Sequence, residues 1–553
     1  MRFLLIIFLT LPTLAESIRM PSEARLWLRV PEGAAPLPIP EVDTGTATRA
    51  TWEKDPALRD RTTNIQFPIR WWDWSAITLR FTPTADTTVD LILSGTWEEH
   101  TGGKPHRQET HWDHLTATGT TLTNGSFEEI PSTSPPTPTG WTTPWQPYPA
   151  AHSFPLANLT PLHGKNLAAS WHDRPLQQTL TLRAGVPVTL TLHARSVPPP
   201  DFVKPKRLGQ NTPAHTAIRH LHRGVNLGNC WEAPPPYTWG IRYTTDDIDA
   251  IAAQGFDHIR VPVAWHFHLK TDPQGKTHIS PDLLRDLEPV LKHALRKNLR
   301  ILLDWHHFHD LTKDPATHKP TFITGWETIA RHFKNWPDTL LLELLNEPCD
   351  ALTTEAVNPL HAETIRAIRL IDPTRILILS PGKFGHISEL DRLHLPDDDP
   401  RLIVTVHCYE PFHFTHQGAE WVNLQDLRNI IFPGPPATPL PVPETLKNNP
   451  EIVDFIHRYN TAPTAQNPSS DLHLRALLTQ ARQWSDHFGR PIHLGEIGSI
   501  TLADPASRLR HAIAVRDLAQ HHKIPYTWWD WKARFAYWDQ KTNQPLLPNL
   551  LKN

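Results

Sequence analysis

From residue 223 onward, short apolar segments alternate with longer segments of helical character, and this alternation constrains the fold more than any other feature. The apolar segments are RGVNLGN (223–229), HIRVPVAW (258–265), RILLDWHH (300–307), TLLLELLNEP (339–348), RILILSP (375–381), LIVTVHCYEP (402–411), PIHLGEIG (491–498) and PYTWWDW (525–531). Near-continuous apolar runs are typical of strands that are buried on both faces, as in parallel sheets. Eight strand–helix units within about 330 residues predict an α/β fold, a (β/α)8 barrel with its active site at the C-terminal ends of the strands.

Residues 16–200 show a different pattern, with short alternating segments and no long helical stretch. The segments at 76–81 and 88–95 place apolar residues at every second position, and 176–195 has the pattern of two strands joined at 184–187. Alternation of this kind, interrupted by turn residues, predicts an all-β antiparallel sandwich in front of the barrel.

Two short motifs in this region suggest what kind of sandwich it is. TNGSFEE (123–129) and PTGW (138–141) resemble the opening of carbohydrate-binding modules of the jelly-roll type. The resemblance implies one such module or two shorter ones. Five tryptophans would then form a sugar-binding platform or pack in the core: Trp71, Trp72, Trp74, Trp141 and Trp145.

The ends of these regions define the expected domains. Residues 1–15, MRFLLIIFLTLPTLA, resemble a secretory signal peptide, and no later segment has 18 uninterrupted apolar residues, so we expect a secreted or periplasmic protein without a membrane span. The Pro-rich residues 201–213 predict a semi-rigid linker. The predicted domains are therefore the sandwich at 16–200 and the catalytic domain at 214–553.

Charge and cysteine content exclude several classes of function. The formal net charge of −3 argues against a nucleic-acid partner held by basic patches. No two of the three cysteines, Cys230, Cys349 and Cys408, have metal-ligand spacing, which argues against a zinc site, and their odd number leaves at least one thiol free. We expect a monomer without a metal ion.

Two of the apolar segments end in a carboxylate. Glu347 closes LLLELLNEP and Glu496 lies near the end of PIHLGEIG, so both belong to the rim where the active site of a barrel lies. Cleavage of a glycosidic bond needs two carboxyl groups on one face, one as acid and one as nucleophile or base. This chemistry requires no cofactor.

Other polar and aromatic residues also come late in the predicted strands. A single polar residue at a strand end is usually a surface cap, but a complete set on one rim indicates a binding site. Its members are Arg260, His306, His307, Asn346, His407, Tyr409 and Trp529. Glu343 lies on the same strand face as Glu347, and we expect it to lie deeper in the barrel or to pair locally, without a catalytic role.

The segments that carry these residues resemble glycoside hydrolase family 5, the cellulase-like retaining enzymes. The motifs RGVNLGNCWEAP, GFDHIRVPVAW, DWHH, LLNEP, HCYEPFHFTHQGAEW and GEIG occur in the order of the family, and the match covers residues 214–553. FTHQGAEW (414–421) is most similar to the bacterial subfamily that cleaves both β-1,4-glucans and β-1,4-mannans.

The resemblance implies a role for each residue of the set. Glu347 is the expected general acid/base and Glu496 the expected nucleophile. Arg260 is expected to keep Glu496 ionised, since a nearby opposite charge favours the charged form. Tyr409 is expected to donate to the same carboxylate, and Asn346 to contact the sugar 2-hydroxyl.

The remaining residues are expected to contact or surround the sugar. Trp529 is the expected floor under the sugar at the cleavage point. His306 and His407 are expected to position hydroxyl groups, and His307 to contact sugar or pack behind it. Similar substrate-contacting positions are implied for Asn229, Glu232, His416 and Trp421.

Two features depart from the family pattern. The segment between residues 421 and 471 is long and rich in proline, and it predicts a lid or a narrower cleft. Arg534 and Ala536 stand where glycine is common.

The sequence thus predicts an exported retaining enzyme that cleaves β-1,4-glucans, an endoglucanase or cellulase. The alternatives are a β-mannanase, a xyloglucanase or an exo-acting β-glucosidase on the same machinery, and a non-catalytic polysaccharide-binding protein. The expected partner is a β-glucan or β-mannan, as polysaccharide or oligosaccharide.

Overall fold

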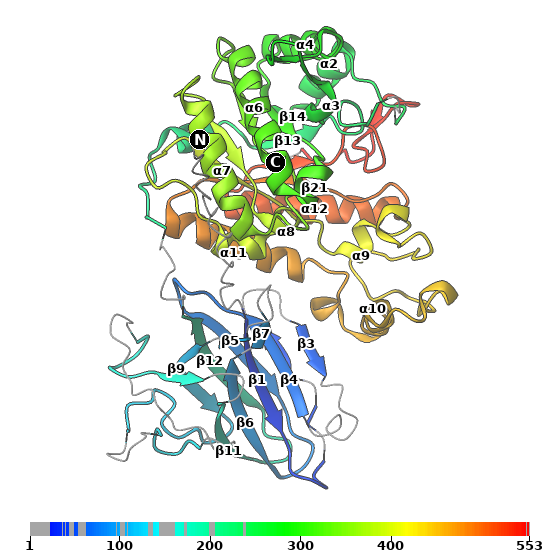
Figure 1. The fold of residues 1–553 in the computed structure, drawn as a ribbon. Helices are drawn as coiled ribbons and strands as arrows, with labels where there is room; N and C mark the ends of the chain where they lie inside the picture. The colour runs from blue at the N-terminus through cyan, green and yellow to red at the C-terminus, as the bar shows by residue number, and fades with distance from the viewer. Residues whose placement is uncertain are drawn as a thin grey trace, which may run out of the picture. The chain divides into compact units, whose positions relative to one another are not determined.

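The computed structural model describes residues 23–551 with gaps at 36, 39, 44–48, 53–61, 96, 100–104, 108, 131–136, 143–160, 171–173, 198–204, 236–238 and 549. The predicted signal peptide, Trp145 and the first residues of the predicted linker lie outside the described residues. The chain divides into two compact units, Met1–Val203 and Lys204–Asn553 (Figure 1).

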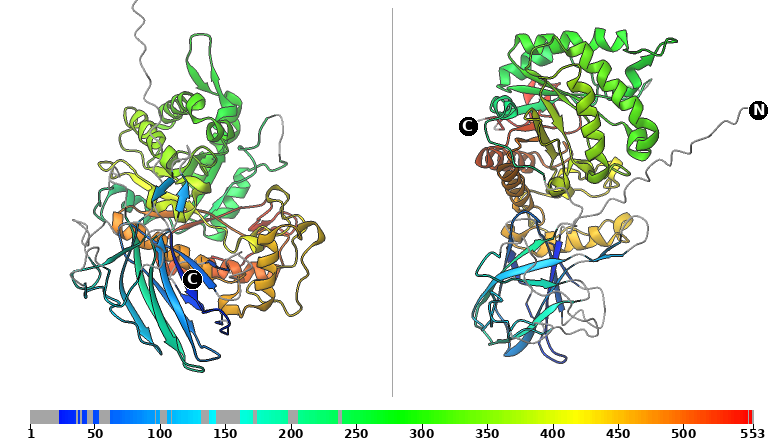
Figure 2. Two further views of the ribbon diagram at one scale, coloured as in Figure 1. Left: turned by 60° about the horizontal axis from the view of Figure 1, so that its bottom comes forward. Right: turned by 60° about the vertical axis from the view of Figure 1, so that its left-hand side comes forward.

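The first unit contains two antiparallel sheets of five strands each, as the alternating sequence pattern predicts (Figures 1 and 2). One sheet has the order β11 (Leu176–Leu182), β6 (Thr87–Gly95), β1 (Glu23–Arg29), β4 (Thr62–Pro68) and β3 (Arg49–Trp52). The other has the order β10 (Ala168–Ser170), β9 (Thr110–Thr118), β12 (Val188–Ser196), β5 (Ser75–Phe81) and β2 (Glu41–Asp43). Strands β7 (Trp97–Glu99) and β8 (Pro105–Arg107) form a separate antiparallel pair.

Alternate residues of both sheets face a shared apolar core. In β5, Ile77, Leu79 and Phe81 are buried while Ala76 and Arg80 are exposed, which is the period-two pattern of a strand with one solvated face. The neighbouring strands β11 and β12 belong to different sheets, so the turn between them crosses the sandwich and connects its two layers.

The TNGSFEE motif forms a folded corner of this sandwich. The Asn124 side chain donates to the carbonyl groups of Glu129 and Thr139, at 2.9 and 3.2 Å. Trp141 donates from its indole nitrogen to the carbonyl of Asn124 and packs against Phe127. Trp141 is only 4% exposed, so of the two roles considered for it the structure shows core packing.

The second unit contains a closed barrel of eight parallel strands, which confirms the predicted fold class. Its strands are β13 (Arg223–Asn226), β14 (His258–Val263), β17 (Arg300–Trp305), β18 (Leu340–Glu343), β19 (Leu377–Leu379), β20 (Leu402–His407), β21 (Ile492–Ile497) and β22 (Tyr526–Trp528). Strand β13 pairs with both β14 and β22, and this closes the ring.

Helices surround these strands in the views of Figures 1 and 2. The longer ones are α2 (Thr245–Gln254), α4 (Pro281–Arg296), α6 (Pro315–Phe333), α7 (Thr354–Arg369), α10 (Pro450–Thr461), α11 (Leu472–Phe488) and α12 (Pro505–His522). The shorter ones are α1 (Pro213–Ile218), α3 (Trp265–His268), α5 (His309–Lys313), α8 (Gly382–Gly385) and α9 (Phe412–Thr415). Two small antiparallel pairs complete the unit: β15 (Leu269–Thr271) with β16 (Thr277–Ile279), and β23 (Trp538–Asp539) with β24 (Gln544–Pro545). In the described part of the chain, no helix combines the length and apolar character that crossing a membrane requires.

The described part of the predicted linker lies against the barrel. The backbone N–H of Leu208 donates to the carbonyl of Phe488 at 2.9 Å, and the Arg207 side chain donates to the carbonyl of His487 at 2.7 Å. Gly489 has a positive φ of 65°, and a Cβ there would lie 2.0 Å from the Leu208 carbonyl oxygen. Glycine is therefore required both by the helix end and by this contact.

The long segment after residue 421 shares an apolar core with neighbouring loops of the barrel mouth. Helix α10 contributes Ile452, Phe455, Ile456 and Tyr459 to this core, and each of them is at most 3% exposed. Residues at the rim of the barrel pack against the same core: Tyr409, Trp529 and Phe535. The segment is thus a built extension of one wall of the barrel mouth.

Candidate active site

Arg260 lies at the centre of a buried charge network in the barrel. It comes from strand β14 and is 0% exposed. Its Nε and one terminal nitrogen donate to the two carboxylate oxygens of Glu343, at 2.9 and 2.7 Å. Asp304 lies 2.7 Å from the same terminal nitrogen. The two hydrogen bonds to Glu343 fix the plane of the guanidinium group and therefore the direction in which its remaining N–H groups point.

The register of the strands brings these groups together. Arg260 lies beside Asn226 on strand β13, and Asp304 on β17 lies beside Glu343 on β18. Arg260 donates 3.0 Å to the Asn226 side-chain oxygen and 2.7 Å to that of Asn346. Arg260 also donates to the carboxylate of Glu496 at 2.7 Å, so the network includes the expected nucleophile.

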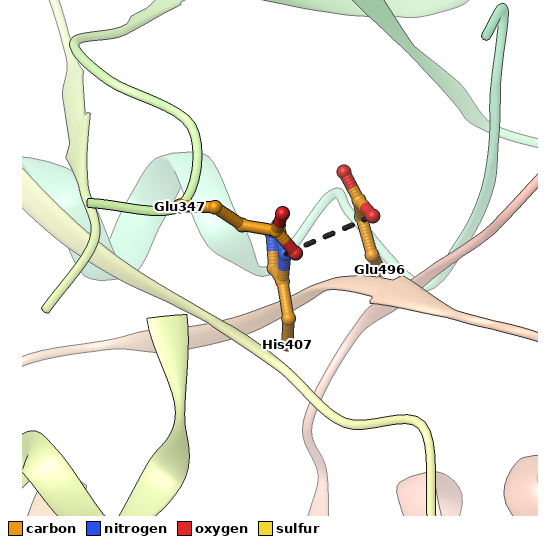
Figure 3. A group of neighbouring side chains, drawn as sticks. All are labelled: Glu347, His407 and Glu496. Atoms are coloured by element: carbon orange, nitrogen blue, oxygen red, sulfur yellow. Dashed lines mark hydrogen bonds and ion pairs between the residues drawn. The ribbon is translucent and has the colours of Figure 1, made fainter. Parts of the chain in front are cut away.

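Glu347 and Glu496 face each other across the barrel mouth, as Figure 3 shows. Glu496 lies on strand β21, whereas strand β18 ends at Glu343 and Glu347 follows in the loop with a positive φ of 49°. One carboxylate oxygen of each residue and one His407 ring nitrogen all lie within 4.8 Å of one another. In retaining glycosidases, the two carboxyl groups are roughly 5–5.5 Å apart, and the arrangement in this chain has that short spacing.

Different hydrogen-bond partners distinguish the two carboxyl groups. Glu496 accepts from Arg260 at 2.7 Å and from the Tyr409 hydroxyl at 2.8 Å. Glu347 contacts the Nδ1 of His407 at 2.8 Å. A cation and a hydroxyl donor favour the charged form of Glu496, and no matching cation contacts Glu347 among the described residues.

Burial affects the protonation of both groups. It raises the pKa of Glu347 to about 7, against the opposing charge of Arg260. Burial and the neighbouring Glu347 raise the pKa of Glu496 to about 7 as well, while His407, Arg260 and Tyr409 oppose this increase, so the hydrogen bonds and not these values distinguish the two groups. Because Arg260 and Tyr409 donate directly to Glu496, we infer that the pair retains its last proton on Glu347.

His306 and Trp529 form an aromatic surface beside this pair. Their rings are stacked, with centroids 5.6 Å apart and an interplanar angle of 4°. His306 is 1% exposed, and its Nδ1 lies 3.1 Å from Asp304. A Cβ on Gly228 would lie 2.8 Å from the Trp529 ring, so the glycine allows the indole to pack closely on the loop after β13.

Three further predicted residues lie around the loops after β13 and β17. Glu232 is 1% exposed and accepts hydrogen bonds from the backbone N–H groups of Asn229 and Cys230, so it holds its own loop. The Asn229 amide group donates to Asp530 at 3.4 Å. His307 is half-buried, has a positive φ of 53° and packs its ring on that of His306.

His416 and Trp421 lie together after strand β20. The His416 ring contacts Tyr409 with centroids 4.9 Å apart, and Trp421 follows at 6.4 Å from His416. His416 is 7% exposed and Trp421 is 51% exposed, so Trp421 is the one that presents a broad surface to solvent.

The spacing of Glu347, His407 and Glu496 would also suit a metal ion, since each offers one ligand atom. The contacts of the Glu496 oxygens argue for another use. One oxygen accepts from Arg260 and the other from Tyr409, and these donors compete with a cation for the same lone pairs.

Sequence reasoning missed the residues that hold Arg260. Asp304 and Asn226 were not singled out, and Glu343 was expected deep in the barrel or paired locally, without Arg260 as its named partner. A signal for two of them exists in the sequence, because Asp304 and Glu343 each interrupt an apolar strand. A charge inside a buried strand needs a partner.

A parallel barrel with two facing carboxyl groups at its rim is the arrangement that glycoside hydrolases of this fold use. The chain belongs to glycosyl hydrolase family 5. The model of this family, described as cellulase (glycosyl hydrolase family 5), matches residues 221–535.

Relatives with assigned names support this membership. The chain is 31% identical to endoglucanase C of Acetivibrio thermocellus over 301 residues, which are 52% of this chain and 84% of the relative. It is 27% identical to endoglucanase H of the same species over 315 residues, 57% of this chain and 30% of the relative. The chain thus spans less than two thirds of the length of some curated relatives, among them endoglucanase H.

Solved structures show the same barrel. The Thermotoga maritima Cel5A structure in complex with cellobiose, in a mutant form, has a TM-score of 0.52 and 30% identity, covering 62% of this chain and 99% of that one. A cellulose synthase subunit Z from Clostridioides difficile has a TM-score of 0.50 and 27% identity, covering 60% of this chain and all of that one.

Proposed function

We propose that this protein is a retaining endo-β-1,4-glucanase. The observation that carries the proposal is the short spacing of Glu347 and Glu496, combined with the two donors that Arg260 and Tyr409 direct at Glu496. The pair has an acid that keeps its proton and a carboxylate that keeps its charge. A double displacement needs these two states at the start of the reaction.

In the first step, Glu496 attacks the anomeric carbon of the sugar while Glu347 transfers its proton to the leaving oxygen. The bond from the anomeric carbon to the leaving oxygen breaks, and a covalent glycosyl-enzyme forms on Glu496. As Glu496 loses its charge, the hydrogen bonds from Arg260 and Tyr409 weaken, and they become strong again when the carboxylate is released.

In the second step, water cleaves the glycosyl-enzyme. Glu347, now ionised, takes a proton from this water, and the oxygen attacks the anomeric carbon as Glu496 leaves. The His407 ring contacts Glu347 at 2.8 Å and lies 3.8 Å from Glu496, so it can stabilise the negative charge on whichever carboxylate carries it.

The substrate proposal draws on the site and on the relatives. Trp529 stacked on His306 provides a flat floor for a sugar ring, and Asn346 is held by Arg260 at the position proposed for the 2-hydroxyl contact. Relatives that match the barrel are named endoglucanases. We therefore assign a β-1,4-linked glucan as the substrate.

A second candidate is cleavage of short oligosaccharides. It is favoured by the extension after residue 421, whose core packs against Tyr409 and Trp529 at the mouth of the barrel. A protein named cellodextrinase A, from Ruminococcus flavefaciens, is 25% identical to this chain over 322 residues, 55% of this chain and 84% of that protein. The lengths of the products from cellohexaose distinguish the two modes.

The remaining features of the proposal concern the whole chain. We propose that residues 1–15 direct export, that residues 16–200 form a carbohydrate-binding sandwich, and that the catalytic domain at 214–553 acts as a monomer. The half-exposed Trp72 and Trp74 remain candidates for sugar contact in the sandwich. The guanidinium groups of Arg70 and Arg195 lie over their rings at 5.0 and 4.5 Å.

The test is hydrolysis of a substrate panel by the purified protein. The panel contains barley β-glucan, carboxymethyl cellulose, glucomannan, galactomannan and xyloglucan. We expect β-glucan cleavage, and a loss of about 10⁴-fold or more in Glu496→Ala because the nucleophile is removed.

Two further measurements sharpen this test. Azide should rescue Glu496→Ala as an α-glycosyl azide and Glu347→Ala as a β-glycosyl azide, because azide replaces the missing nucleophile in the first variant and the water in the second. A folded wild-type protein that cleaves none of the polymers and no cellohexaose would refute the proposed function.

A further inference from the structure

Arg534 occupies a fixed position on the loop after strand β22. Its backbone carbonyl accepts hydrogen bonds from the N–H and the hydroxyl of Thr501, at 2.8 and 3.0 Å. Thr501 itself follows strand β21, which carries Glu496. The backbone of Arg534 is therefore tied to the strand that provides the expected nucleophile, although its side chain is exposed.

The side chain of Arg534 covers the exposed tryptophan of the barrel mouth. Its guanidinium carbon lies 4.9 Å from the centroid of the Trp421 ring. Trp421 in turn contacts Phe535 and His416, both at 6.4 Å between centroids, and the His416 ring contacts that of Tyr409. A continuous row of rings thus connects Arg534 to the tyrosine that donates to Glu496.

The guanidinium group is free to bind a ligand. Within the part of the chain that the structure describes, no carboxylate is paired with it, and its N–H groups have no hydrogen-bond acceptor. The neighbouring cation of this loop, Lys532, differs because both oxygens of Asp247 accept from it at 2.8 Å. Stacking on an aromatic ring leaves the edge of a guanidinium, with its donors, open.

We propose that Arg534 and Trp421 form a subsite for an acidic substituent, so that the enzyme accepts β-1,4-glucans whose sugar units carry a carboxylate. Two parallel N–H groups of a guanidinium match the two oxygens of one carboxylate. The cation over Trp421 also removes one face of the indole from sugar stacking. This position therefore selects a ligand by its charge, whereas an uncovered indole would select only by the shape of the sugar ring. This inference rests on the proposed function and specifies its substrate.

Two soluble polymers with the same backbone test the subsite. Carboxymethyl cellulose is anionic and hydroxyethyl cellulose is neutral, and they are compared at equal degrees of substitution and low ionic strength. Arg534→Gln should lower kcat/KM about three- to fivefold on carboxymethyl cellulose, because an exposed bidentate charged contact is lost. On hydroxyethyl cellulose the change should be less than twofold.

Matched controls separate the subsite from general charge and from folding. Arg331→Gln removes the same charge from helix α6, where Arg331 pairs with Glu327, and should change neither rate. Sodium chloride at about 0.5 M should reduce the difference between wild type and Arg534→Gln on the anionic polymer, because salt screens exposed charges. A thermal unfolding curve checks that Arg534→Gln is folded.

The outcomes distinguish this inference from the proposed function. If Arg534→Gln lowers both rates by the same factor, Arg534 only supports Trp421 and the acidic subsite is wrong. If folded wild type cleaves neither of these polymers, nor barley β-glucan, nor cellohexaose, the proposed function itself is wrong. If both proteins cleave hydroxyethyl cellulose and Arg534→Gln keeps the wild-type ratio of rates on the anionic and neutral polymers, only the acidic subsite is wrong.

Discussion

At the scale of single residues, the site has more negative than positive charge. Arg260 faces three carboxylates, Asp304, Glu343 and Glu496, and Glu347 lies nearby. Burial raises the pKa of Asp304 to about 6, although Arg260 opposes this. In a poorly solvated cluster, one guanidinium cannot stabilise all of these charges, so a proton is retained near neutral pH.

This excess of negative charge predicts an alkaline limit of activity. The pKa of Glu347 is raised to about 7, so its acid form predominates below that value and is lost as pH rises through it. On β-glucan, kcat/KM should therefore fall about tenfold per pH unit above that point. The pH profile of initial rates shows at which pH this decrease begins.

A substrate that needs no acid provides the control for this prediction. The leaving group of 2,4-dinitrophenyl β-cellobioside departs without protonation, so its cleavage should keep its rate above pH 7. A parallel decline for both substrates would show that the decrease does not come from Glu347.

At the scale of elements, the extension after residue 421 and the barrel are coupled through one apolar core. Tyr459 of helix α10 is 0% exposed, and its hydroxyl accepts a hydrogen bond from the backbone of Ile431 at 2.8 Å. Tyr409 and Trp529 contact the same core, so the packing of helix α10 helps to hold two residues of the site in place. The sequence predicted a lid or a narrower cleft here, and the proline-rich composition gave no sign of a packed core.

Truncation of one residue in this core should therefore reduce activity. Phe455→Ala leaves a cavity in the core, a change that costs about 3–5 kcal/mol for a well-packed phenylalanine. We expect faster proteolysis within residues 432–450 and a kcat/KM about tenfold lower on β-glucan, because the walls that hold Tyr409 and Trp529 loosen.

The same helix offers the matched control. Val453 is 37% exposed on α10, and Val453→Ala should leave both proteolysis and activity close to wild type. If Phe455→Ala is cleaved faster by protease but keeps full activity, the extension does not support the site.

At the scale of the whole molecule, the sequence predicted the two architectures because each has a strong period. Alternation by two along β5 and near-continuous apolar runs in the barrel strands are local signals. The contacts of Arg260 combine residues far apart in the chain, and no local pattern encodes which charges meet. Resemblance to known enzymes supplied the proposed roles of Glu347 and Glu496, and the structure added Asp304, Glu343 and Asn226 around them.

The start of the catalytic domain can be tested at this scale. A chain of residues 205–553 keeps the contacts of Lys206, Arg207 and Leu208 with the barrel, whereas a chain of residues 214–553 loses them. We expect the longer chain to unfold a few degrees higher, since about 1 kcal/mol shifts Tm by roughly 2–4 °C for large domains. Equal Tm values would show that residues 205–213 act only as a linker.

The distribution of the Arg260 partners along the chain has a consequence for synthesis. Asp304 and Glu343 follow Arg260 closely in the order of translation, whereas Glu496 is made only near the end. A growing chain can thus neutralise Arg260 long before the expected nucleophile exists, and with Glu496 as the proposed nucleophile a fragment that stops before residue 496 should be inert. On this proposal, hydrolytic activity should begin only after the last strands have closed the ring, and its appearance would be a chemical signal that the barrel is complete.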